Sequence, residues 1–400
     1  MPNYFSPGIY VEEVPSGARP IGAVGTSVAG FVGVAPDPAA RVDEAVAINT
    51  WSDFLRVYAS GDNPPGTPLA RAVFGFLDNG GTRCYVVNVG EGGQVAGSGR
   101  RRGGVQALEA VDEVAIVAAP GFSDPGSYEA LLSHCELLRD RVAILDPPEQ
   151  VEDLTALTRV GLAGEGRPSG EESPEAGGSA VRPRQSPYGT IYFPWLRVID
   201  PLSGEPVNTP PSGHMAGIWA RSDATRGVHK APANEPVRGA VDLAYLVTRP
   251  EQDLLNPMGV NCIRYFSAEG IRVWGARTLA AEASEWRYIN VRRLFNMLEE
   301  SIADGTRWMV FEPNDPTLWR SIRRDIGAFL TRVWRDGALL GRTPEEAFFV
   351  KCDEETNPAD VRDAGMVVAL VGVAVVKPAE FVVFKLSQWA GGTETETIGS

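Results

Sequence analysis

The sequence predicts a mixed α/β fold with two domains and an extended, strand-forming arm at each end of the chain. The chain has 400 residues, 44% of them apolar, which is enough for more than one hydrophobic core. A strand–helix–strand pattern occupies residues 114–145 and indicates parallel strand pairing. Both ends combine prolines with short β-branched or aromatic runs, a pattern typical of extended segments.

Residues 1–20 are expected to form an N-terminal arm. They contain four prolines and one short strand-forming run, so they can build neither a helix nor a hairpin of their own. After the arm, residues 22–34 predict a buried strand, residues 52–59 a short helix, and residues 85–89 another strand.

Residues 114–145 give the clearest local pattern. The run VAIVAA at 114–119 predicts a buried strand, which a Pro-Gly pair ends. An Asp-Pro pair at 124–125 then offers an N-cap and a proline at the first helical position, so a helix should run to Arg139. Residues 142–145 predict the second strand.

Residues 161–187 are expected to form a disordered or loosely held surface loop. Of these 27 residues, 18 are Gly, Pro, Ser or Glu, which bury too little apolar surface to fix one conformation. Strand-forming residues return at 191–195, and loop-rich chain with strands is expected to about residue 250.

The last 150 residues are denser in regular structure. An apolar stripe from 289 to 302 predicts a helix that Gly305 stops, and residues 308–311 predict a strand. An Asp-Pro pair at 315–316 starts a second helix, and the remaining strands are expected at 348–352, 366–376 and 381–386.

The second of these helices carries five arginines, for which two interpretations stay open. They form either a solvated helix face or a charged interface with another subunit. The five are Arg320, Arg323, Arg324, Arg332 and Arg335.

Charge and composition exclude several classes of function. With 37 Lys and Arg against 51 Asp and Glu, the net charge of −14 argues against a nucleic-acid partner, and the one basic run, at 100–102, is interpreted as a flexible turn. The four cysteines form no C-x-x-C pair and there are three histidines, so no zinc or disulfide framework is expected. The longest apolar run has 13 residues, below the roughly 18 needed to span a bilayer, and no secretory leader is recognised. We therefore expect no metal, no cofactor, no membrane insertion, and folding in the cytoplasm.

The sequence also lacks the common catalytic motifs: no P-loop, dinucleotide-binding glycine pattern, H-E-x-x-H or G-x-S-x-G occurs. One enzyme hypothesis stays open, in which Ser123, Asp124 and Asp146 meet beyond the ends of two parallel strands. Against it, Asp124 is suited to cap the following helix, and Asp146 begins an Asp-Pro-Pro turn. We expect no catalytic residues.

Strand-forming segments at both ends suggest assembly by strand exchange instead. An extended segment that adds to the edge of a neighbour's sheet is held by main-chain hydrogen bonds, each worth roughly 1 kcal/mol net. When a subunit donates to a different subunit from the one that donates to it, the contact is heterologous and builds rings or open helical filaments.

A series of motifs in order along the chain resembles the tail sheath proteins of contractile phage tails and phage-tail-like contractile injection systems. The resemblance runs over nearly the whole length. The motifs are SPGIYVEEV at 6–14, APGF at 119–122, RDRVAILDPP at 139–148, YFPWLRVIDP at 192–201, PPSGHMAGIWARSDATRGVHKAPAN at 210–234, LLNPMGVNCIR at 254–264, GIRVWGARTL at 270–279, EWRYINVRRL at 285–294 and PAEFVVFKL at 378–386.

The resemblance implies a structural subunit that forms stacked hexameric rings around an inner tube and contracts to drive the tube through a target envelope. Its partners would be further copies of itself, the tube protein, and baseplate and cap proteins. It would be assembled in a bacterial or archaeal cytoplasm as part of a phage tail or injection particle that is released. Another ring-forming component of the same machine, a sheath paralogue or cap, is the nearest alternative.

The resemblance also implies a division of the chain. We expect an N-terminal linking arm at 1–20, an outer domain at 21–250, an inner α/β domain at 251–377, and a C-terminal arm and tail at 378–400. In the family, strands from both arms pair with the inner-domain sheets of neighbouring subunits. Mapped here, the linking strands are Ile9, Tyr10, Val11, Glu12, Glu13 and Val14 at the N-terminus and Phe381, Val382, Val383, Phe384, Lys385 and Leu386 at the C-terminus.

Two further sets of residues are assigned by the same reasoning. Hinges for the arms are expected at Pro15, Gly17, Pro20, Lys377 and Pro378, although these prolines can equally serve only to end strands. The segment 357–365 is a candidate attachment helix or an exposed connector, with Asp360, Arg362 and Asp363 as tube-facing candidates.

Overall fold

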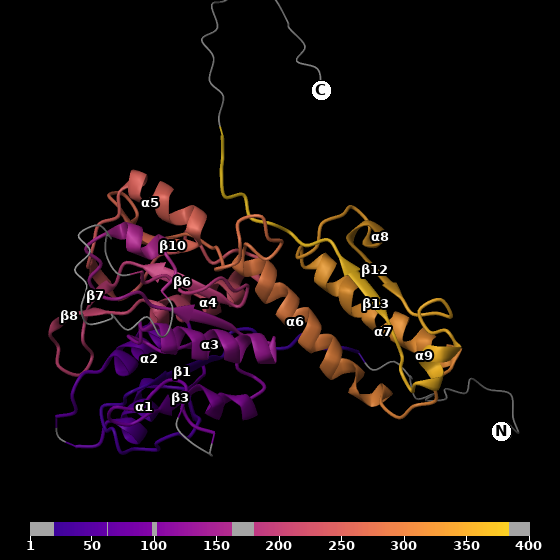
Figure 1. Cartoon of the computed structure of the whole chain (residues 1–400), viewed down its shortest axis with the longest axis horizontal. Helices are drawn as coiled ribbons and strands as arrows, with labels where there is room; N and C mark the ends of the chain where they lie inside the picture. Colours follow the sequence, from indigo (N-terminus) through magenta and orange to yellow (C-terminus); the bar gives the residue numbers. More distant parts are fainter. Residues whose placement is uncertain (1–19, 62, 98–101, 162–179, 384–400) are drawn as a thin grey trace, which may run out of the picture.

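The computed structural model describes residues 20–61, 63–97, 102–161 and 180–383. They fold into a larger lobe built around a mixed sheet and a smaller lobe formed by the later part of the chain (Figure 1). Within these ranges no helix has the length and apolar character needed to cross a membrane.

An eight-stranded sheet forms the centre of the larger lobe. Its strand order is β11-β10-β6-β5-β4-β1-β3-β2, and the five inner pairings from β10 to β3 are parallel, whereas both outermost pairings are antiparallel. The inner strands are buried on both faces, as parallel strands require. The strands are β1 (Ala29–Gly33), β2 (Val46–Ile48), β3 (Cys84–Asn88), β4 (Ile116–Ala118), β5 (Val142–Leu145), β6 (Gly189–Phe193), β10 (Val260–Phe266) and β11 (Gly270–Trp274).

Helices cover both faces of this sheet, so the lobe has two hydrophobic cores. One core is formed with α1 (Trp51–Tyr58), α2 (Pro68–Asp78), α4 (Ser212–Arg226) and a small antiparallel sheet of β7 (Leu196–Ile199), β8 (Pro206–Thr209) and β9 (Ala240–Leu243). The other core is formed with η1 (Gly104–Ala110), α3 (Pro125–Leu138), η2 (Leu154–Thr158) and α5 (Arg249–Leu255), which η3 (Asn256–Met258) follows.

Two glycines let α4 approach α2 closely. A Cβ atom at Gly213 would lie 2.3 Å from the Cα of Ala72, and one at Gly217 would lie 2.4 Å from the carbonyl oxygen of Phe76. Only glycine fits at such distances, which explains the small residues in the SGHMAG stretch of this helix.

The smaller lobe has its own core between helices and a two-stranded sheet. The core includes Leu294, Leu298, Trp319 and Phe329. The elements are α6 (Ile289–Thr306), η4 (Arg307–Met309), α7 (Pro316–Arg335), α8 (Pro344–Ala347), β12 (Phe348–Lys351), α9 (Ala359–Asp363) and β13 (Leu370–Val373). Ile21, from the other end of the chain, is fully buried in the same core.

The strand–helix–strand prediction for residues 114–145 is confirmed. β4 and β5 pair in parallel, and α3 connects them. The side chain of Asp124 caps the helix by accepting a hydrogen bond from the Ser127 amide at 2.9 Å, and Arg139 ends it in the left-handed conformation. The second Asp-Pro helix is confirmed as α7, with Asp315 as its N-cap.

The strand predicted at 308–311 is wrong. Residues 307–309 form η4, and the chain then turns, with Phe311 at a φ of 69° and its side chain fully exposed. The segment joins α6 to α7, and no strand of the described residues pairs with it, so its apolar residues alone do not make a strand.

The strand predicted at 366–376 is shorter than expected. β13 contains only Leu370–Val373, because side chains bind the backbone that precedes it. The Asn357 carboxamide donates to the Val368 carbonyl at 3.0 Å and accepts from its amide at 2.7 Å, and Asn314 donates to the Met366 carbonyl at 2.8 Å. These groups are therefore unavailable for a strand ladder.

The large sheet continues beyond residue 250, where the sequence predicted a domain boundary. β10 and β11 lie after this residue yet extend the sheet through β6. Leu279 still belongs to a core of the larger lobe, whereas Leu294 belongs to the core of the smaller lobe. Ile289, the first residue of α6, also belongs to a core of the larger lobe, so the change of core falls within α6, between Ile289 and Leu294.

Most of the predicted loop at 161–187 lies outside the described residues, but its two ends do not. The amide of Gly161 donates to the carbonyl of Arg182 at 3.0 Å. The Arg182 guanidinium donates to the Met258 carbonyl at 2.8 Å, and Arg184 pairs with Glu129 and Glu136 on α3 at 2.7 Å each. Residues 180–187 are thus held against the larger lobe, in contrast to the loose loop predicted there.

Candidate linking sites

The base of the N-terminal arm is fastened to both lobes. Residues 9–14 and the predicted hinge residues Pro15 and Gly17 lie outside the described residues, and Pro20 is exposed. From Ile21 onward the chain is held, since the Val24 amide donates to Ser301 Oγ at 3.0 Å and the Thr26 hydroxyl donates to Asp223 at 2.6 Å. Among the described residues, the segment from Ile21 to Thr26 is thus attached to both lobes.

A buried ion pair completes this attachment. The Arg293 guanidinium on α6 contacts Asp223 on α4 at 2.5 and 3.0 Å, and it also donates to the carbonyl of Thr26 at 2.9 Å. Both side chains are almost entirely buried, and the guanidinium lies 4.6 Å from the ring of Trp219. One cation thus joins the smaller lobe, the larger lobe and the N-terminal segment.

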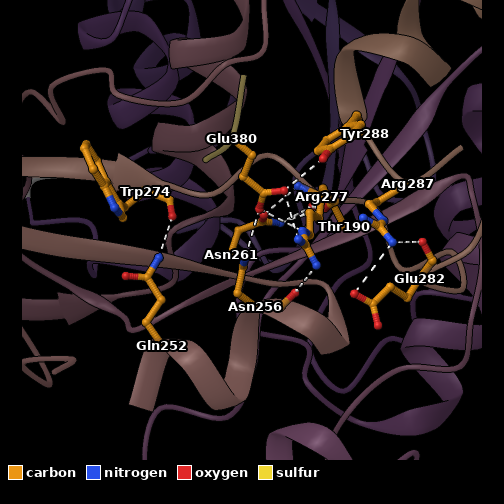
Figure 2. Close-up of polar contacts among 10 residues, drawn as sticks. All are labelled: Thr190, Gln252, Asn256, Asn261, Trp274, Arg277, Glu282, Arg287, Tyr288 and Glu380. Atoms are coloured by element: carbon orange, nitrogen blue, oxygen red, sulfur yellow. Dashed lines mark hydrogen bonds and ion pairs between the residues drawn. The ribbon is translucent and has the colours of Figure 1, made fainter. Parts of the chain in front are cut away.

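The base of the C-terminal arm is held by a second polar cluster, which Figure 2 shows. The Glu380 carboxylate accepts two hydrogen bonds from Arg277, at 2.8 and 2.9 Å, one from Tyr288 Oη at 2.9 Å and one from Asn256 Nδ2 at 2.9 Å. These hydrogen bonds outweigh the effect of burial and lower the pKa of Glu380. We call these four residues the Glu380 cluster.

Beyond this cluster the chain presents a row of exposed apolar side chains. Phe381, Val382 and Val383 are 71%, 69% and 78% exposed and belong to no strand. Phe384, Lys385 and Leu386, the rest of the predicted linking strand, lie outside the described residues. In a single chain these three apolar residues contact little of the protein.

The two-stranded sheet of the smaller lobe has exposed apolar side chains as well. β12 and β13 are antiparallel and, within the described part of the chain, pair only with each other; an isolated bridge joins Leu339 to Val375, just after β13. Phe349 and Leu370 on the outer side are 54% and 53% exposed. The sheet therefore has main-chain groups along its edges that can accept a further strand.

The tube-facing candidates lie on an exposed helix. Asp360, Arg362 and Asp363 belong to α9 and its end, and all three are exposed. The Arg362 guanidinium lies 6.0 Å from the ring of Trp319. The prediction of a short helix at 357–365 is confirmed, and its role stays a prediction.

The residues of the enzyme hypothesis are engaged in local structure. Asp124 caps α3, accepting from the amide and hydroxyl of Ser127 at 2.9 and 2.6 Å. Asp146 accepts from the amide and hydroxyl of Ser212 at 2.9 and 2.6 Å, and burial raises its pKa to about 7. Among the residues that the structure describes, no group of His, Cys, Asp or Glu is placed to bind a metal ion.

A group of carboxylates lies where α6 passes the larger lobe. Burial, followed by the charges of Asp140 and Asp304, raises the pKa of Glu300 to about 7. The ordinary pKa of a glutamate is 4.5. Between about pH 4.5 and 7, Glu300 is therefore protonated in the folded protein and ionised in the unfolded chain. The stability of the protein should therefore fall as the pH rises through this interval.

Glu300→Gln should raise the midpoint of thermal unfolding at pH 8, with a much smaller difference at pH 5. Glutamine is neutral at every pH, so the variant lacks the cost of ionising a buried carboxylate above pH 7. Scanning calorimetry at both pH values measures the effect. Glu312→Gln, which changes an exposed carboxylate, is the control and should behave like the wild type. Equal shifts at pH 5 and pH 8 would contradict this assignment.

Sequence reasoning missed the Glu380 cluster and the ion pair between Arg293 and Asp223, although it had singled out the motifs that contain these residues. Arg277, Tyr288, Asn256 and Glu380 each lie in a different quoted motif, and so do Asp223 and Arg293. The motifs therefore marked the segments involved, but not which of their residues contact one another. Asn256 and Glu380 are 124 residues apart, and Arg293 and Thr26 are 267 residues apart, so only the folded chain shows which residues meet.

Comparison with known protein families gives two matches that follow one another along the chain. Residues 103–279 match the model of the phage tail sheath protein central domain, and residues 281–388 match the phage tail sheath C-terminal domain. The junction between the two matches lies shortly before α6, within which the chain passes from a core of the larger lobe to the core of the smaller lobe.

Individual relatives agree with the family matches. A tail sheath protein of Vibrio phage KVP40 is 33% identical over 176 residues, which are 43% of this chain and 25% of that protein. The chain thus spans about a quarter of the length of this relative.

Solved structures match over nearly their full length. The sheath of the extracellular contractile injection system PVC in its contracted state has a TM-score of 0.76 and 29% identity, with 98% of this chain and 99% of that chain covered. The helical sheath of the anti-feeding prophage in its contracted state has a TM-score of 0.74 and 30% identity, with 96% and 99% covered.

Proposed function

This chain belongs to the phage tail sheath family, and from that premise we propose that it is a structural subunit that polymerises into a contractile sheath. The observation that carries this proposal is the match to two contractile sheath subunits along 99% of their length, at 29% and 30% identity. Such a subunit forms part of a phage tail or of a released injection particle, and its work is mechanical rather than catalytic.

The linking strands are proposed to join neighbouring subunits. Residues 9–14 and 381–386 would each add to the two-stranded sheet of a neighbour, which has open edges and exposed apolar side chains at Phe349 and Leu370. At roughly 1 kcal/mol net for each main-chain hydrogen bond, a short strand contributes a few kcal/mol, and the contribution is repeated at every subunit.

The smaller lobe, together with the N-terminal segment that packs in it, would form the inner domain, and the larger lobe the outer domain. We further propose that the subunits stack as hexameric rings around an inner tube, that α9 faces the tube, and that baseplate and cap proteins bind the ends. Contraction would be a rigid-body rearrangement toward a state of lower free energy, so no nucleotide is needed. Assembly would take place in the cytoplasm of a bacterial or archaeal host.

Negative-stain electron microscopy of the purified chain, alone and with its tube protein, tests the proposal. Striated hollow cylinders are the expected result. Single rings that never stack would favour the alternative of a cap or a sheath paralogue. A monodisperse monomer or dimer under all conditions would contradict the proposal and would favour the enzyme hypothesis, which places a site at Asp146 and the strand ends around it.

Replacing Phe381 and Val383 together by Asp should abolish cylinder formation and leave the monomer's thermal stability unchanged. Both side chains are exposed in the single chain, so their replacement costs the monomer little, whereas two buried charges would disrupt a strand added to a neighbour. Leu137→Asp is the matched control, since Leu137 on α3 is 71% exposed, the same fraction as Phe381. Cylinders of normal length from the double variant would show that this segment is not a linking strand.

A further inference from the structure

The segment between β13 and the exposed apolar row crosses from the smaller lobe to the larger one (Figure 1). At its start, the Val376 amide donates to the carbonyl of Ala338, and the Asn290 side chain donates to the carbonyl of Val376, at 3.3 Å each. At its end, Glu380 lies in the Glu380 cluster, whose other members belong to or adjoin the larger lobe. The predicted hinge at Lys377 and Pro378 thus lies between two fixed points.

The groups that hold Glu380 are themselves fixed by the larger lobe. The amide of Arg277 donates to Asn261 Oδ1 at 2.7 Å, and its carbonyl accepts from Asn261 Nδ2 at 2.8 Å and from Thr190 Oγ1 at 2.9 Å. Its guanidinium also donates to the carbonyl of Asn256 at 3.1 Å. Asn261 and Thr190 are fully buried, and Arg277 is 4% exposed (Figure 2). Arg277 is therefore held in place by contacts that do not depend on Glu380.

We propose that Arg277, Tyr288 and Asn256 form a carboxylate-binding site in the larger lobe, and that its ligand is Glu380 of the same chain, which fixes where the C-terminal linking strand leaves the subunit. This proposal rests on the proposed function. The donors suit a carboxylate, because Arg277 binds both of its oxygens in parallel and Tyr288 and Asn256 supply one further donor to each. The pivot of the arm then lies after Glu380, at residues 381–383, and not at Lys377 and Pro378.

The consequence for assembly follows from chain geometry. An extended chain advances about 3.3 Å per residue, so releasing the four residues from 377 to 380 would let the start of the linking strand move by roughly 13 Å. Neighbouring strands lie about 4.8 Å apart, so this freedom exceeds the spacing that defines one strand position. The site thus determines which sheet edge of a neighbouring subunit the linking strand can reach and in which register it pairs there. It also transmits tension on the arm to the larger lobe.

Hydrogen exchange of the soluble, unassembled full-length protein tests the site directly. The Val376 amide, which donates to the carbonyl of Ala338, is the probe. In Glu380→Gln its exchange should rise by about tenfold or more, the size expected from losing one charge-assisted hydrogen bond. The midpoint of thermal unfolding should shift by no more than about 4 °C. Glu354→Gln, at an exposed carboxylate of the smaller lobe, is the control and should leave exchange unchanged.

A double-mutant cycle distinguishes a direct interaction between Arg277 and Glu380 from independent destabilisation of the segment by each substitution. If the two residues form one site, Arg277→Gln, Glu380→Gln and the double variant should give nearly the same increase in exchange, whereas independent effects would add. Electron microscopy of the Glu380→Gln variant should then show short or irregular cylinders. Unchanged exchange, additive effects, or cylinders of wild-type length and regularity would each overturn the proposal. A wild-type protein that forms no cylinders would instead contradict the proposed function, while the exchange measurement still reports on the site.

Discussion

Deletion of residues 1–19 should leave a folded, soluble protein that no longer forms long cylinders. The deletion must end before Ile21, because this side chain is fully buried and Val24 and Thr26 are hydrogen-bonded to Ser301 and Asp223. Removing only the residues before Pro20 keeps these contacts, so the thermal unfolding of the monomer should match the wild type. The linking strand proposed at 9–14 would be lost, and with it one of the two connections to neighbouring subunits.

Electron microscopy and sedimentation of the truncated protein measure this effect. Deletion of residues 388–400, which lie beyond both proposed linking strands, is the control and should permit normal assembly. A third variant that lacks residues 1–26 should also lose thermal stability, since it removes Ile21 from the core of the smaller lobe. Full-length cylinders from the protein without residues 1–19 would show that the N-terminal arm does not link subunits.

Arg293→Met should lower the free energy of unfolding by about 3–5 kcal/mol. The substitution leaves Asp223 buried without its cation, and a charge that is desolvated and unpaired is strongly destabilising. The contact with the ring of Trp219 and the hydrogen bond to the carbonyl of Thr26 are lost as well. Chemical denaturation followed by tryptophan fluorescence measures the loss.

Two further variants test the explanation. Arg307→Met removes an exposed pair between η4 and Asp304 near the end of α6, and it should cost less than about 1 kcal/mol. Replacing both Arg293 by Met and Asp223 by Leu should recover much of the stability that Arg293→Met loses, because no buried charge is then left unpaired. A double variant as unstable as Arg293→Met would indicate that lost packing, and not the unpaired carboxylate, is the cause.

The sequence predicted the local elements best where a short signal decides the structure. Asp124 and Asp315 cap helices because a carboxylate accepts from amides two or three residues further along, and such a contact is visible in the sequence. Residues 308–311 show the opposite case. Their apolar character suited a strand, but a strand also needs a neighbour to pair with, and within the part of the chain that the structure describes the connection between α6 and α7 pairs with no strand.

The candidate linking sites were predictable in outline only. The exposed apolar residues that follow Glu380 could be recognised as a strand-forming segment from their side chains alone. The place where the arm is fastened could not, because Glu380 and Arg277 are 103 residues apart and meet only after the chain has passed through both lobes. The same holds for Arg293 and Thr26, which are 267 residues apart.

The position of Ile21 has a consequence for the order in which the protein is made. This side chain belongs to a core whose other members come mainly from residues 294 onward, and Gly305 leaves it room on α6. During synthesis from the N-terminus, the ribosome must deliver α6 and α7 before the first segment has a place to pack. Each nascent chain therefore carries an unattached N-terminal segment until α7, which ends at Arg335, has been translated.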